Sequence, residues 1–242
     1  MRLILIHARV MTVELARYPA FLIPTLVFPA VFFLFFVTPG PKQDATVRMA
    51  TFAGFAVIGI AFFQFGVGIA GERGSPWERY LRTLPVGPLV RLGARILSAA
   101  VFACAAAGLL VVTAVVATGA SLAAERWAQL AFVLLAGTIP FAFLGIALGY
   151  WAPSRGALPV ANLLYLGLSY AGGLWSRPGA LPHVVRVVSP YLPTRALSDA
   201  LVSVATGASP AWSAWAVLAT FACIFATLAT VGYRRDEERR FS

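Results

Sequence analysis

Charged residues are scarce in this sequence. Only 12% of its 242 residues are Asp, Glu, Lys or Arg, whereas 60% are hydrophobic. Soluble chains average about 25% charged and about 45–50% apolar residues. A soluble core of this size cannot hide so much apolar surface, because a folded surface needs polar cover. The composition therefore argues against a soluble enzyme or a soluble DNA-binding domain, and it indicates a membrane protein.

Lysine is almost absent, since Lys42 is the only lysine among 19 basic residues. A nucleotide-binding P-loop needs the pattern G-x-x-x-x-G-K-[ST], but Lys42 lies between Pro41 and Gln43. This sequence therefore holds no such motif. The net charge of +10 is typical of the positive-inside loops of membrane proteins, so we expect no nucleic-acid partner.

Cysteine and histidine occur only twice each. Cys104 and Cys223 lie in apolar stretches and indicate neither a disulfide framework nor a metal site. His7 and His183 are far apart, which argues against a histidine dyad or a multi-histidine metal site. The apolar stretches also lack the paired charges of a proton relay. We therefore expect no catalytic, metal or cofactor-binding residue in this chain.

Six long stretches contain no charged residue, and the shortest, 156–176, has 21 residues. A helix of that length measures about 32 Å and can cross a hydrocarbon core of about 30 Å. A charge inside that core costs about 2.5–3.5 kcal/mol on insertion scales, so charge-free stretches are the natural spans. The sequence predicts an all-α integral membrane protein with one domain, 1–242, and six transmembrane helices near 19–38, 50–70, 96–118, 128–150, 157–175 and 211–232.

The loops between these spans set the predicted orientation. An even number of spans puts both termini on one side, and that side receives 13 of the 19 basic residues. We therefore predict a multi-pass protein of the cell (inner) membrane with cytoplasmic N- and C-termini. No cleavable signal peptide is expected, because the apolar run 3–6 is too short. Residues 1–17 mix Arg and Glu with aliphatic residues and predict an interfacial helix; a frayed charged tail is the alternative.

The cytoplasmic loop 71–95 carries a residue pattern that is not needed to connect two transmembrane helices. Ser75 and Glu78 form a capping box, Pro76 suits the first helical position, and Pro85 ends the helix. One face of this short helix is apolar and consists of Trp77, Tyr80, Leu81 and Leu84. The pattern predicts an amphipathic helix at the membrane surface, which either docks on a partner or only anchors the loop.

The outer segment 177–209 is rich in proline and yet apolar, which is unusual for a solvated loop. Its prolines are Pro178, Pro182, Pro190 and Pro193, and valine and leucine fill much of the rest. Irregular backbone at membrane depth must be buried in protein or line a wet cavity. We expect a re-entrant-like segment of broken helices before the last span; an ordinary outer amphipathic helix is the alternative.

Together these features resemble the membrane subunits of type-2 ATP-binding-cassette transporters, the ABC-2 permeases. Such permeases carry an E-R-x-x-G-T-x-E-x-L-x-x-x-P-V-like stretch after the second span. The matching residues here are Gly71-Glu72-Arg73-Gly74-Ser75, Glu78, Leu81 and Pro85-Val86, although Ser75-Pro76-Trp77 departs from the usual Gly-Thr-Leu. Further similarities are the entry to the third span, Arg91–Leu97, and the proline motif Ser189-Pro190-Tyr191-Leu192-Pro193.

The resemblance implies that the loop helix is a coupling helix that docks on a separate ATPase subunit. The residues it assigns to this role are Glu72, Arg73, Trp77, Glu78, Arg79, Tyr80, Leu81, Arg82 and Leu84. It also implies that the chain is not itself an enzyme and holds no cofactor, because Mg-ATP binds to the partner. A second copy of the chain or a paired permease would supply the other half of the translocation pathway.

The resemblance further implies export of hydrophobic small molecules, drugs or lipids. Phe62 and Phe63 either line the pathway or face lipid, and Gln64 and Asn162 either face a cavity or bond across helices. Two alternatives stay open: an integral-membrane enzyme that modifies lipids, and an ATP-independent carrier or channel. An ATPase that co-purifies with the chain would distinguish the exporter from both.

Overall fold

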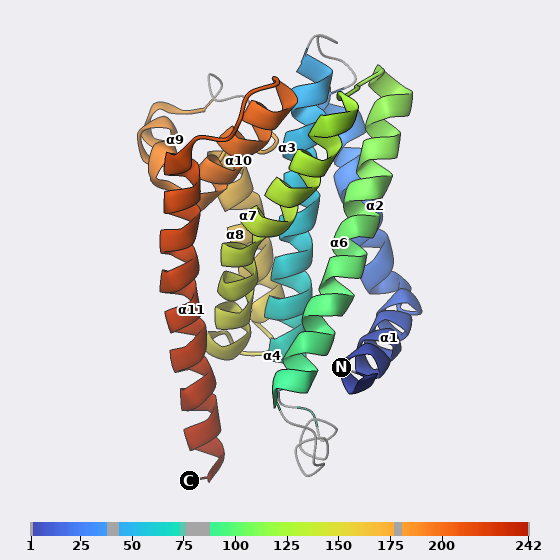
Figure 1. The fold of residues 1–242 in the computed structure, drawn as a ribbon. Helices are drawn as coiled ribbons and strands as arrows, with labels where there is room; N and C mark the ends of the chain where they lie inside the picture. Colours follow the sequence, from blue (N-terminus) through green and yellow to red (C-terminus); the bar gives the residue numbers. More distant parts are fainter. Residues whose placement is uncertain (1, 38–43, 74, 76–87, 177–180, 242) are drawn as a thin grey trace.

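The computed structural model describes residues 2–37, 44–73, 75, 88–176 and 181–241. Every regular element within these ranges is a helix, and no strand occurs there (Figure 1). The elements are α1 (Arg2–Ala16), α2 (Pro19–Val37), α3 (Ala45–Ile60), the π-helix η2 (Ala61–Val67), α4 (Gly68–Glu72), α6 (Pro88–Thr118), α7 (Ala124–Trp151), α8 (Ala157–Ala171), α9 (His183–Val188), the 3₁₀-helix η4 (Ser189–Tyr191), α10 (Pro193–Ala205) and α11 (Trp212–Phe241).

The predicted all-α fold is confirmed, and each predicted span contains a helix. Four helical stretches are long and apolar enough to cross a membrane: Ala45–Glu72, Leu92–Thr118, Ala124–Trp151 and Trp212–Glu237. Helices α1 and α2 count as a fifth if their pair, which is bent by 73°, forms one broken span. The structure thus gives four or five candidate spans rather than six.

Helix α8 is one predicted span that does not count among these candidates, and α2 is the other unless it counts together with α1. Helix α8 has 15 residues, or about 22 Å, which is shorter than a hydrocarbon core of about 30 Å. The sequence placed the end of this span near residue 175, but α8 ends at Ala171. Gly172 follows in close contact with Thr194, and Gly173 has φ 78°, a conformation that favours glycine and ends a helix.

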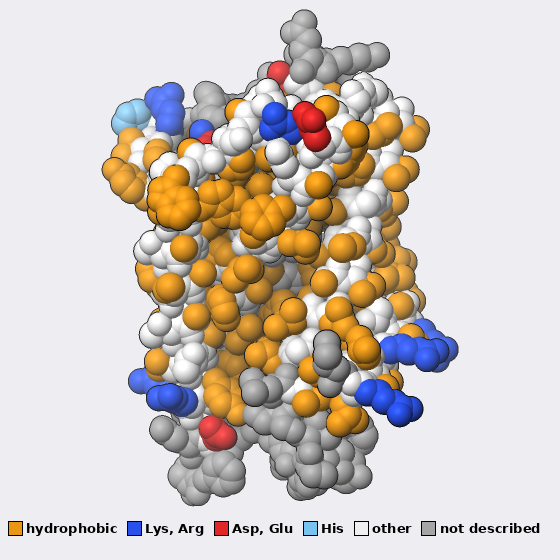
Figure 2. All heavy atoms as spheres, in the orientation of Figure 1, with side chains coloured by type: hydrophobic (Ala, Val, Ile, Leu, Met, Phe, Trp, Pro, Cys, Tyr) orange, Lys and Arg blue, Asp and Glu red, His pale blue; other side chains and the backbone are white. Residues whose placement is uncertain are grey.

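On the face that Figure 2 shows, charged side chains gather at the two ends of the bundle, and a hydrophobic band lies between them. Both termini lie at one end, where α4 also ends and α6 begins (Figure 1). We call this the terminal end and the opposite one the α10 end. The band is apolar because the spans expose large aliphatic and aromatic side chains, such as Phe35, Val116 and Leu163.

The continuous helix formed by α3, η2 and α4 lies at the centre of the bundle. In an apolar stretch of 18 residues of this helix, 83% is buried, whereas in the corresponding stretch of α11 only 17% is buried. Helices α2, α6, α7, α8 and α10 all pack against α3, and the side chains of Phe52, Phe55 and Phe62 are completely buried. A helix that is hydrophobic on all sides is expected in such a central position.

The segment before the last span consists of broken helices, as predicted, and fills the α10 end of the bundle. Its longest piece, α10, buries one face against α3, α7 and α11. Leu201 lies against Gly54 of α3 and Leu197 against Gly137 of α7, where the absent side chains make room. The apolar face of α10 is therefore covered by protein, a condition under which irregular backbone can lie at membrane depth.

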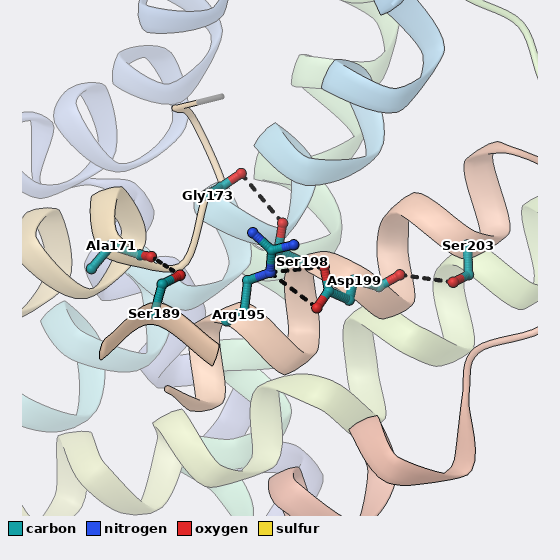
Figure 3. A network of polar contacts seen from close by, with 7 residues as sticks. All are labelled: Ala171, Gly173, Ser189, Arg195, Ser198, Asp199 and Ser203. Carbon is teal, nitrogen blue, oxygen red and sulfur yellow. Dashed lines mark hydrogen bonds and ion pairs between the residues drawn. The ribbon is translucent and has the colours of Figure 1, made fainter. Parts of the chain in front are cut away.

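Hydroxyl groups attach the same segment to the end of α8 (Figure 3). Ser189 Oγ donates to the carbonyl of Ala171 at 2.5 Å, and Ser198 Oγ donates to the carbonyl of Gly173 at 3.3 Å. Arg195 and Asp199 form an ion pair one helical turn apart along α10, with Nε and Oδ1 2.9 Å apart. The two serine bonds use carbonyls near the end of α8, which have no partner within that helix.

Candidate functional site

The candidate site lies at the terminal end, where the central helix leads into the loop that the sequence singled out. Glu72 is the last residue of α4 and forms an ion pair with Arg95 of α6. Arg95 Nη1 also donates to the carbonyl of Gln64 in η2 at 3.1 Å. The Arg95 side chain is well buried and the Glu72 side chain half exposed, so one guanidinium links α6 to two turns of the central helix.

Arg73 follows Glu72 and contacts two further helices. Its guanidinium donates to the carbonyls of Tyr150 and Ala152, the latter at 2.9 Å, and these carbonyls belong to the end of α7. Its Nη1 also lies 3.5 Å from Asp236 Oδ1 of α11. A cation is favourable at a helix C-terminus, because the last carbonyls have no partner within the helix.

Two adjacent residues therefore connect the central helix to α6, α7 and α11. We call Glu72 and Arg73, with their partners Arg95 and Asp236, the α4 junction. Ser154 strengthens it, because its Oγ donates to the carbonyl of Ala70 at 2.6 Å. Glu72 supplies the contact with α6, and Arg73 supplies those with α7 and α11.

The contact between Arg73 and Asp236 is one that the sequence does not suggest. The acidic run Asp236-Glu237-Glu238 suggests a solvated helix end, yet the Asp236 side chain is only 14% exposed and is paired. The sequence offers no local signal for this pair, because the two residues lie on different helices far apart along the chain. The alternation of basic and acidic residues after Tyr233 is the only hint.

The structure describes two of the nine predicted coupling residues, and they are Glu72 and Arg73. The other seven, Trp77, Glu78, Arg79, Tyr80, Leu81, Arg82 and Leu84, lie outside the described residues. The predicted coupling helix therefore stays a prediction, and the structure shows how the chain enters the loop that contains it.

The four predicted pathway residues lie in different surroundings. Phe62 is completely buried and Gln64 is 3% exposed, whereas Phe63 and Asn162 are half-buried. Phe62 and Phe63 contact the ring of Tyr165 on α8, with centroids 6.3 and 5.6 Å apart. Asn162 Nδ2 donates to the carbonyl of Leu158 in its own helix at 3.1 Å.

Gln64 lies in a polar chain that crosses from the central helix to α1. Its Nε2 donates to Ser98 Oγ of α6 at 3.0 Å, and Ser98 Oγ lies 3.1 Å from Thr12 Oγ1 of α1. Gln64 Oε1 is buried and has no hydrogen-bond partner among the described residues. The bond to Ser98 is one of the two roles that the sequence left open for Gln64.

The π-helix η2 was not predicted, and it forms the part of the central helix that packs most closely on α7. The G-x-x-x-G pair Gly145 and Gly149 lies on this face of α7, and its spacing predicts close helix packing. A Cβ added at Gly145 would collide with the carbonyl oxygen of Ala61, and one added at Gly149 would lie 2.7 Å from Ile69 Cβ. Single wide turns of this kind are frequent at functional sites.

Comparisons with known proteins agree with this architecture. A family model described as "ABC-2 family transporter protein" matches residues 40–231. The chain is also 23% identical over 227 residues to the Bacillus subtilis (strain 168) protein named "Putative transport permease YvfS"; the match covers 91% of this chain and 93% of that protein. No solved structure matches the chain.

Proposed function

Because this chain belongs to the ABC-2 family of transporter proteins, we propose that it is the permease subunit of an ATP-driven exporter. The family and the apolar helices identify a multi-pass membrane protein and a transport subunit. In our proposal Mg-ATP is hydrolysed on a separate ATPase subunit, since this sequence contains no P-loop. A second copy of the chain, or a paired permease, completes the pathway. The protein lies in the inner membrane of the cell, and both of its termini face the cytoplasm.

The α4 junction is the observation that supports coupling to an ATPase. The loop that begins after Arg73 carries the residues proposed to dock on the partner. Force applied to that loop reaches α6 through Arg95, α7 through the carbonyls of Tyr150 and Ala152, and α11 through Asp236. Without these contacts to α6, α7 and α11, a movement of the docking helix would displace only its own loop and leave the other helices in place.

The docking itself is assigned to the apolar face of Trp77, Tyr80, Leu81 and Leu84, with Glu78, Arg79 and Arg82 beside it. An amphipathic helix commonly binds by placing such a face in a groove, and tryptophan, tyrosine and arginine supply most of the binding energy at interfaces. The transported cargo in this proposal is a hydrophobic small molecule, drug or lipid. Phe62, Phe63, Gln64 and Asn162 remain the proposed pathway residues.

Affinity purification of the tagged chain from its own membranes tests this function. We expect an ATP-binding-cassette ATPase in near-equal amount, identified by mass spectrometry, and ATP hydrolysis in the eluate. A lipid-modifying enzyme or an ATP-independent carrier would be recovered without an ATPase. Reproducible recovery of the chain alone in several mild detergents would therefore contradict the proposal.

Substitutions in the loop test the docking face. We expect Trp77→Ala or Leu84→Asp to weaken ATPase binding about 30-fold, the effect of losing one interface hot spot. Trp212→Ala is the matched control, because Trp212 is 82% exposed at the α10 end. Equal ATPase recovery with Trp77→Ala, Leu84→Asp and the control would remove the coupling-helix assignment.

A further inference from the structure

A groove between α1 and α6 has features that neither coupling nor a cargo pathway explains. Its volume is about 260 Å³, and it is lined by Leu5, Ala8, Arg9, Thr12, Val13, Leu97 and Val101. Five of these seven side chains are aliphatic. Both helices that form it reach the terminal end of the bundle (Figure 1). The groove is thus an open, mostly apolar surface between two helices near one end of the bundle.

One cation stands at this groove, and its charge is uncompensated. The Arg9 side chain is exposed and, among the residues that the structure describes, has neither a hydrogen-bond nor an ion-pair partner. Arg2 lies seven residues earlier, on the same face of α1 as Leu5 and Arg9. The rim of the groove is therefore positively charged, whereas its walls are apolar.

We propose that this groove binds one anionic phospholipid, with an acyl chain against Leu5, Val13, Leu97 and Val101 and the phosphate at Arg9. Arginine binds phosphate through two parallel N–H bonds, and a long arginine side chain can extend along apolar surface to reach a headgroup. The volume of about 260 Å³ lies below the range of about 300–1,000 Å³ for drug-sized ligands, so the groove takes only part of one acyl chain and the rest of the lipid stays outside it.

The base of the groove links this lipid to the centre of the bundle. Thr12 lines the groove and lies 3.1 Å from Ser98 Oγ, which accepts a hydrogen bond from Gln64. A bound acyl chain would hold α1 against α6 and so keep Thr12 next to Ser98. The proposal needs only that the chain lies in a membrane, and it does not depend on an ATPase partner.

Native mass spectrometry of the detergent-solubilised chain tests the proposal. The chain is titrated with phosphatidylglycerol and with phosphatidylcholine that carries the same acyl chains. We expect about fivefold tighter binding of phosphatidylglycerol, since one arginine near an anionic lipid contributes about a factor of five. Arg9→Gln should reduce this affinity to that of phosphatidylcholine, whereas Arg17→Gln, an exposed arginine outside the groove, should leave it unchanged.

Filling the groove tests the acyl-chain part separately. Val101→Trp should reduce binding of both lipids at least fivefold, whereas Val112→Trp, on an exposed part of α6 outside the groove, should not. Leu5→Trp fills the groove from α1 if Val101→Trp does not fold. Three results would overturn the proposal: equal affinity for both lipids, equal losses with Arg9→Gln and Arg17→Gln, or displacement of the lipid by glycerol 3-phosphate alone.

Discussion

The two ends of the bundle differ in the contacts that hold them, although Gly149 of α7 also packs closely on Ile69 of the central helix near the terminal end. At the terminal end, Glu72 and Arg73 make charged and carbonyl contacts with α6, α7 and α11. At the α10 end, glycines receive the side chains of α10, as at Gly54 with Leu201 and Gly137 with Leu197. The charged contacts depend on a few directed groups, and Arg73, Arg95 and Asp236 are largely buried, whereas close packing involves every atom of the interface and resists any change of shape. We therefore expect the terminal end to move and the α10 end to stay rigid.

The largest expected effect comes from breaking the packed end. Gly172→Val would place a side chain on Thr194, with the added Cβ 2.7 Å from the backbone carbonyl carbon of that residue. Because backbone cannot move aside as a side-chain tip can, we expect a loss of about 3 kcal/mol, the upper part of the range for overpacking.

Thermal unfolding in detergent measures this loss. Gly167→Val is the matched control, since it makes the same substitution in α8 where no atom lies within 4 Å. A similar unfolding temperature for the two variants would mean that the α10 end is not closely packed.

A smaller effect on stability, with a large effect on coupling, is expected at the charged end. Arg73→Gln removes the ion pair with Asp236 and weakens the contact with the end of α7, which should cost about 2 kcal/mol. If the α4 junction transmits force, ATP hydrolysis continues in the purified complex while transport falls. A double-mutant cycle with Asp236→Asn separates the ion pair from the carbonyl contacts.

Retention of full transport by Arg73→Gln, at unchanged protein level, would contradict the assignment of movement to this end. Loss of transport together with loss of the folded chain would instead show that the junction is a packing element like those at the α10 end.

The smallest effect is expected for the ion pair on α10. Arg195 and Asp199 are neighbours along one helix, and the carboxylate side chain is half exposed. Such i,i+4 pairs contribute about 0.3–0.5 kcal/mol. Arg195→Gln should therefore hardly change the unfolding temperature or transport, and this variant calibrates the larger effect at Arg73. A loss as large as that of Arg73→Gln would show that charge matters equally at both ends.

The helices could be predicted from the sequence because charge excludes a residue from the bilayer core. The charge-free stretches around Phe55, Val112 and Leu135 all lie in helices that are long and apolar enough to cross a membrane. The early end of α8 could not be predicted in this way, because Gly172 and Thr194 meet only in the folded chain. Hydropathy reports neither this contact nor the positive φ of Gly173, which is the local signal for the helix end.

The candidate site could be predicted only in part, and the reason is similar. Glu72 and Arg73 are identified through the resemblance of Gly71-Glu72-Arg73-Gly74-Ser75 to the stretch that ABC-2 permeases carry after the second span. Their partners Arg95 and Asp236 carry no signal of pairing in the sequence. The π-helix could not be predicted for another reason, because Ala61–Val67 has the composition of an ordinary apolar helix. Its wide turns occur where Ala61 packs against Gly145 of α7, a contact between distant residues.

The π-helix also affects how the second span should be compared with related sequences. A π-turn holds more residues than an α-turn, so this span contains an extra residue between two stretches of normal helix. A relative whose second span is α-helical throughout would present the same faces before and after this point with one residue fewer. An alignment of the two chains is then correct only with a one-residue gap inside a hydrophobic span. Without that gap, every position from Gly68 to Arg73 would be compared with its neighbour.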